Sequence, residues 1–438
     1  MPEQTTLFAP ATGSGRSAVG VIRISGPAST AVIRSLAGPL PAPRRLSLRT
    51  LRAPDGTQLD QALIAWMPAP ASFTGEDMVE LHLHGGVAVR GAVLRALAEI
   101  PGCRPAEPGA FTRRAFLNGR LDLTEAEGIA DLIDAETEAQ RRQALRQLDG
   151  ALGKTVADWR HRLVDLLAGV EAALDFSDEG DVDDAALDAT LADAARTIRD
   201  EISAVLADAR RGERLRDGFT VVLAGPPNAG KSTLLNALSR REAAIVSPTP
   251  GTTRDVIEIR CDLGGLPVIL VDTAGLRDAG DAIEAEGIRR TRMRMEQADL
   301  VVLLEGPEGE AGVDMPPLDG SVLRVRSKRD LVPAGAVPDT QIGISALTGS
   351  GLDRLMAAIE ARAAEAVGSG DALITRERHR LGLTRCRAHL DRLLAGVALP
   401  ELAAEDLRLA VRALGEVAGH VGVEEMLDRL FSGFCIGK

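Results

Sequence analysis

Apolar residues in the first part of the chain form short runs separated by turns. Residues 18–26, 63–67 and 78–84 each combine β-branched and aliphatic residues over a strand's length, so we expect three strands there. A helix is predicted after Gly85-Gly86, from Val89 to Ile100. This mixture predicts an α+β domain over residues 1–120.

The pattern then changes to the spacing of amphipathic helices. Ile129, Leu132 and Ile133 mark one buried face of a helix predicted from Thr124 to Leu148, with Thr124 as its cap. The acidic run from Asp175 to Asp184 is predicted to be a solvated loop between two further helices. Further helices are predicted over residues 153–174, 185–211 and 371–432.

Between these helical segments, strands and helices alternate. Strands are predicted at residues 219–224, 256–263, 266–271, 300–304, 322–326 and 341–344, and helices at 283–297 and 352–365. Such alternation is typical of a doubly wound, mostly parallel sheet. We therefore expect an α/β domain at residues 216–368, inserted into one all-α helical domain formed by residues 121–215 and 369–438.

Composition narrows the class of protein. A chain of 438 residues with 45% hydrophobic and 26% charged residues fits a soluble protein of two or three domains. It has no apolar run of about 18 residues and no signal peptide, which predicts no membrane span. The four cysteines, Cys103, Cys261, Cys386 and Cys435, have neither disulfide-framework nor zinc spacing, which favours a reducing cytoplasm.

Charge and aromatic content limit the ways in which the chain can bind nucleic acid. A net charge of −12 argues against binding through the overall field. With 2% aromatic residues and no tyrosine, a surface that stacks many bases is excluded.

The strand at 219–224 leads into Gly225-Pro226-Pro227-Asn228-Ala229-Gly230-Lys231-Ser232, and a helix follows. Strand, glycine-bounded loop and helix together make a phosphate-binding P-loop, in which backbone N–H groups point at anionic oxygens. Lys231 is expected to reach the β- and γ-phosphates and Ser232 to bind Mg²⁺.

Four later segments stand in the order found in GTPases. Asp272-Thr273-Ala274-Gly275 is expected near Mg²⁺ and the γ-phosphate, and the threonine-bearing loop Gly251-Thr252-Thr253-Arg254-Asp255 is suited to closing over the metal. Ser327-Lys328-Arg329-Asp330 ends a strand, and Asp330 is expected to accept hydrogen bonds from guanine N1–H and the 2-amino group. A backbone N–H at Ser345-Ala346 would meet guanine O6, so these two segments favour GTP over ATP.

Leu276 stands where small GTPases place a glutamine that orients water, so hydrolysis needs another arrangement. Asn228 offers a side-chain oxygen for a monovalent cation beside the β/γ bridge, and this cation would supply the charge of an arginine finger. Glu284 either positions water or is a surface glutamate at a helix start; the residues alone leave both readings open.

Two further groups are candidates for chemistry. Glu80, His82 and His84 share one face of a strand; packing is favoured over a metal pair for the histidines, and Glu80 needs a cation or a ligand N–H as its partner. The terminal Cys435-Ile436-Gly437-Lys438 does not fit a prenylation signal. Cys435 is therefore catalytic or buried, and burial, the usual state of cysteine, is predicted.

Taken together, these motifs resemble the MnmE (TrmE) family of tRNA-modification GTPases over the whole chain. The segments that carry the resemblance are Val21–Gly26, Glu80–Gly86, Ala115–Arg120, the P-loop with Asn228, Gly251–Asp255 and Phe434–Lys438. The resemblance implies an N-terminal folate-binding and dimerising domain, a discontinuous helical domain and an inserted Ras-like GTPase domain. It also implies a cytoplasmic homodimer whose GTPase domains dimerise with K⁺.

The resemblance further implies a reaction. Together with the FAD-dependent partner MnmG, in a heterotetramer or larger complex, such a protein adds an aminomethyl or carboxymethylaminomethyl group to C5 of the wobble uridine of certain tRNAs. The one-carbon unit comes from 5-formyl- or 5,10-methylene-tetrahydrofolate.

The resemblance also assigns residues to roles. Folate contacts fall to Arg23, Glu80, Arg120 and Lys438, where Arg120 replaces a residue that is often lysine. K⁺ is expected at Asn228, Ser247, Thr249 and Thr252, and Mg²⁺ at Ser232 and Thr253. Glu284 is expected to position the attacking water, and Cys435 is a candidate catalytic thiol. The GTP-binding residues are Asn228, Ala229, Gly230, Lys231, Ser232, Thr233, Ser247, Pro248, Thr249, Pro250, Gly251, Thr252, Thr253, Asp272, Thr273, Ala274, Gly275, Lys328, Asp330, Ser345 and Ala346.

One departure from the family pattern and one alternative function remain. Ser327 replaces the usual asparagine of the guanine motif and is too short both to brace the P-loop and to reach the purine, which predicts weak, fast-exchanging guanine binding. The alternative is a GTP-switched ribosome or ribonucleoprotein assembly factor without modification chemistry. An assembly factor has no use for the folate residues Arg23, Glu80 and Arg120.

Overall fold

The computed structural model describes residues 5–175, 184–241, 243–245, 258–272, 289, 292–306, 322–333, 341–368, 372–395, 400–421 and 424–438. Contacts divide the chain into two compact units. The first comprises Met1–Ala130, Leu148–His161 and Val411–Lys438, and the second comprises Asp131–Gln147 and Arg162–Ala410.

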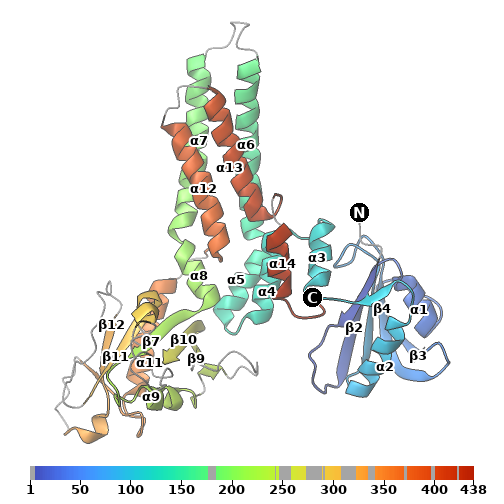
Figure 1. Ribbon diagram of the computed structural model, residues 1–438, viewed down its shortest axis with the longest axis horizontal. Helices are drawn as coiled ribbons and strands as arrows, with labels where there is room; N and C mark the ends of the chain where they lie inside the picture. The colour runs from blue at the N-terminus through green and yellow to red at the C-terminus, as the bar shows by residue number, and fades with distance from the viewer. Residues whose placement is uncertain are drawn as a thin grey trace. The chain divides into compact units, whose positions relative to one another are not determined.

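The first unit contains a six-stranded sheet in the order β3-β4-β5-β2-β1-β6, antiparallel except for the parallel pair β1 and β6 (Figure 1). Its elements are β1 (Thr6–Pro10), β2 (Val19–Ser25), α1 (Ser29–Ala37), β3 (Ser47–Arg52), β4 (Gln58–Met67), β5 (Met78–His84), α2 (Val87–Ala98) and β6 (Cys103–Pro105). Helices α1 and α2 cover one face, where Ile22, Leu81, Val32 and Leu97 are fully buried together. The other face carries Arg23 and Glu80, which are cross-strand partners of β2 and β5.

The same unit has a small helical core. Helices α3 (Ala110–Leu117), α4 (Leu123–Asp134) and α14 (Glu424–Ser432) contribute to the unit, and Leu123, Ile129, Leu427 and Phe431 share one apolar cluster. The predicted cap at Thr124 is wrong, because Asp122 caps α4. Asp122 Oδ1 accepts the N–H of Glu125 at 2.7 Å, and Glu125 Oε2 accepts the N–H of Asp122 at 2.8 Å.

Two predicted long helices are each two helices. The predicted helix 124–148 is interrupted at residues 135–137, after which α5 (Glu138–Leu148) begins. Within this break, Gln140 Oε1 accepts the N–H groups of Glu136 and Thr137 at 3.0 and 3.1 Å, so a side chain replaces the helical carbonyl partners. The predicted helix 185–211 is divided at Asp208 into α7 (Asp184–Ala207) and α8 (Ala209–Asp217).

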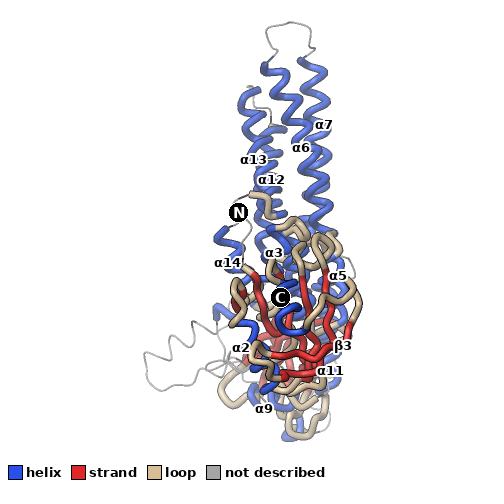
Figure 2. Tube along the Cα trace, turned by 90° about the vertical axis from the view of Figure 1, so that its right-hand side faces the viewer, coloured by secondary structure: helices blue, strands red, loops and turns tan. Residues whose placement is uncertain are grey.

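Four long helices run side by side in a bundle (Figure 2). They are α6 (Ala151–Asp175), α7, α12 (Glu377–Leu394) and α13 (Pro400–Ala418). Within the second unit, ion pairs join α6 to α7 (Arg162–Glu201, 2.7 Å), α7 to α12 (Arg199–Asp391, 3.3 Å) and α13 to α6 (Arg408–Glu171, 2.8 Å). The helical region predicted over residues 371–432 contains α12, α13 and α14. Most of the acidic run 175–184 lies outside the described residues.

The second unit also holds the predicted α/β domain. Its seven-stranded sheet has the order β13-β12-β11-β7-β10-β9-β8, in which β13, β12, β11, β7 and β10 are parallel and β9 is antiparallel to both neighbours. Its elements are β7 (Phe219–Ala224), α9 (Lys231–Leu238), β8 (Ala244–Ile245), β9 (Glu258–Leu263), β10 (Leu266–Asp272), β11 (Leu300–Glu305), β12 (Val322–Arg326), a 3₁₀ turn (Arg329–Leu331), β13 (Ile342–Gly343) and α11 (Leu352–Val367).

This α/β domain has a core on each face of the sheet. On one face, Leu235 of α9 and Leu355 of α11 pack against Val221 and Val302. On the other face, Met295 from the helical residues 292–297 packs against the sheet. The structure thus confirms the predicted fold class: an α+β part, helices, and a mostly parallel doubly wound sheet. Among the helices that the structure describes, none combines the length and the apolar character that crossing a membrane requires.

Candidate functional site: a P-loop and an arginine–glutamate cluster

The P-loop has the backbone geometry that its sequence predicts. Gly225 has φ +148°, and a Cβ there would lie 2.5 Å from the carbonyl oxygen of Leu304, so only glycine fits. Asn228 and Gly230 also have positive φ, at +64° and +95°, and α9 begins at Lys231. The loop therefore turns sharply from β7 into a helix N-terminus, where N–H groups are oriented to bind phosphate.

Three polar side chains meet at this loop. Lys231 is buried, with 9% of the residue exposed, and its ammonium donates to the carbonyl oxygens of Gly225 at 2.8 Å and Pro226 at 3.0 Å. The Ser232 hydroxyl donates to Asp272 Oδ2 at 2.7 Å, and Asp272 ends β10 with 1% exposure. A hydroxyl and a carboxylate at this distance fit a hard cation such as Mg²⁺, which prefers oxygen ligands.

The segments predicted to read guanine follow β12 and β13. Lys328 adopts φ +55°, and Asp330 is exposed in the 3₁₀ turn that follows it. Ser345 is buried, its N–H donates to the carbonyl oxygen of Ser350 at 2.9 Å, and its hydroxyl accepts the N–H of Thr348 at 3.2 Å. β12 and β13 are parallel strands of the same sheet as β7, which leads into the P-loop. The two segments therefore lie at the edge of the sheet formed by the carboxyl ends of its parallel strands, as the P-loop does.

Several predicted residues lie outside the described part of the chain. They are Ser247, Pro248, Thr249, Pro250, Gly251, Thr252, Thr253, Thr273, Ala274, Gly275, Leu276 and Glu284. The predicted K⁺ ligands Ser247, Thr249 and Thr252, the Mg²⁺ ligand Thr253 and the water-positioning Glu284 therefore remain predictions.

A second cluster lies on the open face of the first unit's sheet. Arg23 donates from Nε and Nη2 to Glu80 Oε1 at 3.1 and 3.0 Å, so Glu80 has the cationic partner that its strand position requires. Arg23 Nη1 also donates to the carbonyl oxygen of Gly437 at 3.2 Å. The carboxyl-terminal end of the chain is thereby bound to this cluster, as the joint assignment of Arg23, Glu80 and Lys438 requires.

Lys438 is the third charged residue of this cluster. Burial, with a smaller contribution from Arg23, holds the pKa of the Lys438 ammonium below its ordinary value, while Glu80 and Cys435 act in the opposite direction. Its carbonyl oxygen accepts the N–H of Phe111 at 3.2 Å. A lysine that is costly to keep charged gains from a ligand that brings negative charge or hydrogen-bond acceptors.

The sequence did not single out the aromatic part of this cluster. The Arg23 guanidinium lies 5.5 Å from the ring centroid of Phe73 and 5.9 Å from that of Phe111. His82 Nε2 lies 3.5 Å from Glu80 Oε2. The sequence predicted that His82 and Glu80 share a strand face, whereas Phe73 and Phe111 come from a loop and a helix that no periodicity relates to β2.

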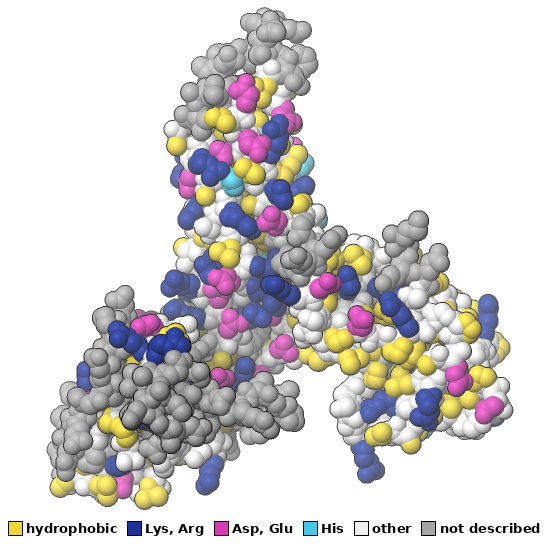
Figure 3. Space-filling view, in the orientation of Figure 1, with side chains coloured by type: hydrophobic (Ala, Val, Ile, Leu, Met, Phe, Trp, Pro, Cys, Tyr) yellow, Lys and Arg dark blue, Asp and Glu magenta, His cyan; other side chains and the backbone are white. Residues whose placement is uncertain are grey.

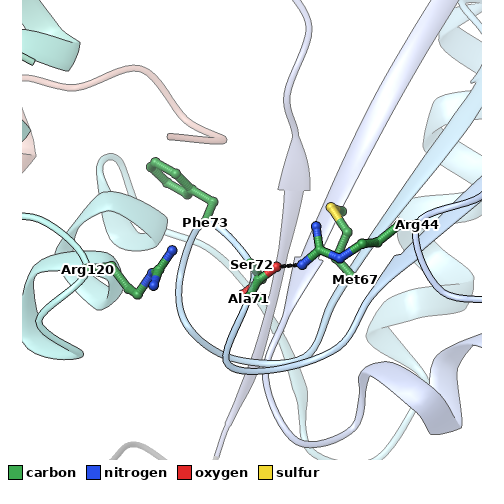
Figure 4. Close-up of a pocket in the computed structure, with 6 residues that line it drawn as sticks. All are labelled: Arg44, Met67, Ala71, Ser72, Phe73 and Arg120. Atoms are coloured by element: carbon green, nitrogen blue, oxygen red, sulfur yellow. Dashed lines mark hydrogen bonds between the residues drawn. The ribbon is translucent and has the colours of Figure 1, made fainter. Parts of the chain in front are cut away.

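Arg120, the fourth predicted folate residue, lines a neighbouring pocket of about 550 Å³ (Figure 4). Its lining residues are Arg44, Met67, Ala71, Ser72, Phe73 and Arg120. Phe73 therefore contacts Arg23 and also lines this pocket.

The described histidines and cysteines form neither a metal cluster nor a disulfide. His84 pairs with Asp60 at 2.7 Å, and among the described residues no group of three or more His, Cys, Asp or Glu side chains is arranged to hold a metal ion. All four cysteines are free thiols. The prediction that Cys435 is buried is wrong: the chain turns at Ile436-Gly437, Gly437 packs against the backbone of Pro10, and the Cys435 side chain is exposed.

Two family models together match most of the chain. Residues 6–120 match a family model described as GTP-binding protein TrmE N-terminus, and residues 123–435 match one described as MnmE helical domain. A curated relative from Methylorubrum populi, named tRNA modification GTPase MnmE, is 68% identical over 99% of this chain and 98% of its own length. The chain belongs to the MnmE family.

Other MnmE relatives span the whole chain in the same way. The protein of Methylobacterium radiotolerans is 66% identical over the full length of both chains, and that of Rhodospirillum rubrum is 51% identical over 99% of each. Membership of the MnmE family makes the chain a GTP hydrolase of tRNA modification, as the sequence predicted.

Proposed function

We propose that the chain is a K⁺-activated GTPase that works with an FAD-dependent partner, MnmG, to modify C5 of the wobble uridine in certain tRNAs. The observation that carries the GTPase part is the meeting of Lys231, Ser232 and Asp272 at a P-loop with left-handed Asn228. Ser232 and Asp272 orient Mg²⁺, and Lys231 binds the β- and γ-phosphates. In this proposal Asp330 accepts from guanine N1–H and the 2-amino group.

Guanine O6 is bound by a backbone N–H in this proposal. The N–H of Ser345 already donates to Ser350, so we assign this contact to Ala346.

K⁺ activation follows from the position of Asn228. Its exposed amide stands on the loop between β7 and α9, where an amide oxygen can hold a monovalent cation near the β/γ bridge. A cation there neutralises charge that develops during phosphoryl transfer. Glu284 positions the attacking water in this proposal, because Leu276 has no group that can do so.

Turnover in K⁺ and in Na⁺ tests this step. The intact protein is expected to hydrolyse GTP at least about 10-fold faster in K⁺. Asn228→Gly removes the amide and tolerates φ +64°, and it is expected to abolish the K⁺ response. Asn236→Ala, which removes an exposed amide from α9, is the matched control. Equal rates in the two salts would refute K⁺ activation and leave GTP hydrolysis standing.

Folate binding is assigned to Arg23, Glu80, Arg120 and Lys438. A pterin carries a row of N–H donors along one edge of its ring. The Glu80 carboxylate, which Arg23 holds in place, can accept hydrogen bonds from these donors. Phe73 and Phe111 add flat apolar surface. When bound, a tetrahydrofolate derivative supplies the one-carbon unit, and the residues of this cluster hold and orient it. Cys435 is exposed and stands near Lys438 at the carboxyl-terminal end of the chain, so in this proposal its thiol is a candidate catalytic group.

Calorimetry with 5-formyltetrahydrofolate tests this assignment on the intact chain. Glu80→Gln exchanges an acceptor for a partial donor and is expected to weaken binding by at least about 10-fold. Glu99→Gln, at an exposed position after α2, is the matched control. Wild-type protein that binds no folate would instead favour the alternative, a GTP-switched assembly factor.

We further propose a cytoplasmic homodimer. Leu48 of β3 and its cross-strand partner Leu63 of β4 are 65% and 41% exposed, and Leu46 beside them is 58% exposed. Figure 3 shows that hydrophobic side chains also gather on the visible face of the α+β domain that contains β3 and β4. Exposed apolar patches mark interfaces. The Leu48→Glu protein is expected to sediment as a monomer, whereas Leu402→Glu, at a 49% exposed leucine of α13, is expected to remain dimeric.

A further inference from the structure

The charged residues that line the pocket around Phe73 are all positive. Two guanidinium groups, Arg44 and Arg120, are among its six lining residues, and none of the six is acidic. In the described part of the chain no carboxylate forms an ion pair with either arginine; Arg44 instead donates to the carbonyl oxygen of Ala71. An open pocket with two cations and no internal counterion favours an anionic ligand group.

The walls of this pocket are held in place. Asn118 donates from its side-chain amide to the carbonyl oxygen of Thr74 at 2.7 Å, and Ser72 Oγ donates to the carbonyl oxygen of Glu76. Gly75 lies under Arg120, because a Cβ at Gly75 would be 3.2 Å from Arg120 Cγ. The loop that carries Phe73 is therefore bound to the segment that carries Arg120, so both side chains keep their places at the pocket.

Arg44 enters from a different turn. Its backbone is left-handed, at φ +59°, and its N–H donates to the carbonyl oxygen of Trp66 at 2.8 Å. Figure 4 shows Arg44 and Met67 on one side of the pocket and Arg120 and Phe73 on the other. Two guanidinium groups on opposite sides suit a ligand with two carboxylates rather than one.

Phe73 relates this pocket to the arginine–glutamate cluster, since its ring also lies 5.5 Å from the Arg23 guanidinium. From Glu80 outward, the molecule thus offers a hydrogen-bond acceptor, an aromatic surface and two cations. A complementary ligand has N–H donors at its head, a flat ring in its middle and carboxylates at its end.

We propose that the pocket binds the glutamyl carboxylates of the reduced folate, with Arg44 as the residue that sets preference for the length of the glutamyl tail. This inference rests on the proposed folate binding and adds to it a tail subsite in which Arg44 pairs with one carboxylate and Arg120 with another. A polyglutamyl folate, which carries more carboxylates, is then bound more tightly than a monoglutamyl one.

Three ligands and three variants of the intact chain test the proposal by calorimetry. The ligands are 5-formyltetrahydropteroate, 5-formyltetrahydrofolate and its triglutamate. Wild type is expected to bind them with rising affinity, the first about 10-fold more weakly than the second. Arg44→Gln, which keeps a long side chain but removes the charge, is expected to lose most of the tail preference and to bind the pteroate unchanged.

Arg45→Gln is the matched control, because Arg45 is the exposed neighbour outside the pocket lining. Arg44→Lys retains the charge and is expected to keep part of the preference. Equal wild-type affinities for the three ligands, or the same loss in Arg44→Gln and Arg45→Gln, would overturn the tail subsite while folate binding itself stands. Absence of binding for all three would overturn the proposed folate function, and this inference with it.

Discussion

The hydroxyl of Ser327 donates a hydrogen bond of 3.0 Å to the backbone carbonyl oxygen of Glu305. Glu305 is the last residue of β11, and Ser327 directly follows the parallel neighbouring strand β12. The N–H of Ser327 donates to the same oxygen at 2.9 Å. Ser327 is 4% exposed and both its donors are directed to one acceptor on β11. The side chain that braces the P-loop in other guanine motifs is therefore replaced by a local bond between β12 and β11.

Ser327→Asn is expected to tighten guanine binding. An asparagine amide is long enough to reach past Glu305 toward the P-loop, and one added hydrogen bond is worth about 1 kcal/mol, roughly 5-fold in affinity. Titration with a fluorescent GDP analogue and stopped-flow release measure the effect. Ser239→Asn, after α9, is the control. An unchanged dissociation rate in a protein with an intact thermal transition would show that the asparagine does not brace the loop.

Ser232→Ala is expected to lower the rate of GTP hydrolysis by roughly 100-fold, because it removes the proposed Mg²⁺ ligand and the hydrogen bond to Asp272. Nucleotide binding measured with excess EDTA should change little, since the P-loop backbone and Lys231 are unaltered. Ser239→Ala removes a hydroxyl that donates to the backbone carbonyl oxygen of Asn236, and this variant should hydrolyse GTP normally. Comparable losses in both variants would mean that the Ser232 hydroxyl has no special role.

Local patterns predicted many strands of the two sheets but missed β1, β3, β6 and β8, and they did not predict where the helices end. The strands at Met78–His84 and Val322–Arg326 have their predicted bounds, because each is a run of strand length that alternates apolar and polar residues in part and ends at a turn. The break between α4 and α5 was missed because the Gln140 side chain satisfies two backbone donors, a bond that apolar spacing does not reveal.

The sites show the same division. Lys231 and Ser232 could be predicted because one contiguous motif fixes their geometry. Glu80 could be identified from its polar position in an apolar strand, but its partner Arg23 is 57 residues away. Phe73, Phe111 and Arg44 reach the proposed folate site from a loop, a helix and a turn, and only the tertiary structure brings them together.

Asp131→Asn is expected to destabilise the second unit by about 3 kcal/mol. The Asp131 carboxylate is 12% exposed and accepts from Arg216 of α8 at 2.9 Å and from Arg376 before α12 at 2.6 Å. In Asp131→Asn the two arginines keep only a neutral, weaker hydrogen-bond acceptor, at the place where α4, α8 and the start of α12 meet. Urea unfolding measures the change.

Asp193→Asn is the matched control for this ion-pair cluster. Asp193 is 79% exposed and pairs with Arg196 on the same helix, so its loss should change stability by less than about 0.5 kcal/mol. A similar shift of the urea midpoint for Asp131→Asn and Asp193→Asn would contradict a structural role of the cluster around Asp131.

Lys438→Met is expected to change how stability depends on pH, because burial and Arg23 keep the pKa of Lys438 below its ordinary value of 10.5. Between that lowered pKa and 10.5 the unfolded chain binds more protons at this residue than the folded chain, so wild-type stability rises with pH there. At neutral pH the folded protein bears the full cost of the charged ammonium, and methionine removes this cost. The stability of Lys438→Met minus that of wild type should therefore fall as the pH rises toward 10.5.

Thermal unfolding of both proteins from about pH 7.5 to about pH 10 measures this difference. Cys435 interacts electrostatically with Lys438, so both proteins should carry Cys435→Ser. Packing differences between lysine and methionine shift the two curves by a constant, whereas the ammonium changes their separation with pH. A separation that stays constant or widens would show that folding does not disfavour the charged Lys438, and the argument that a ligand's negative charge compensates it would then fail.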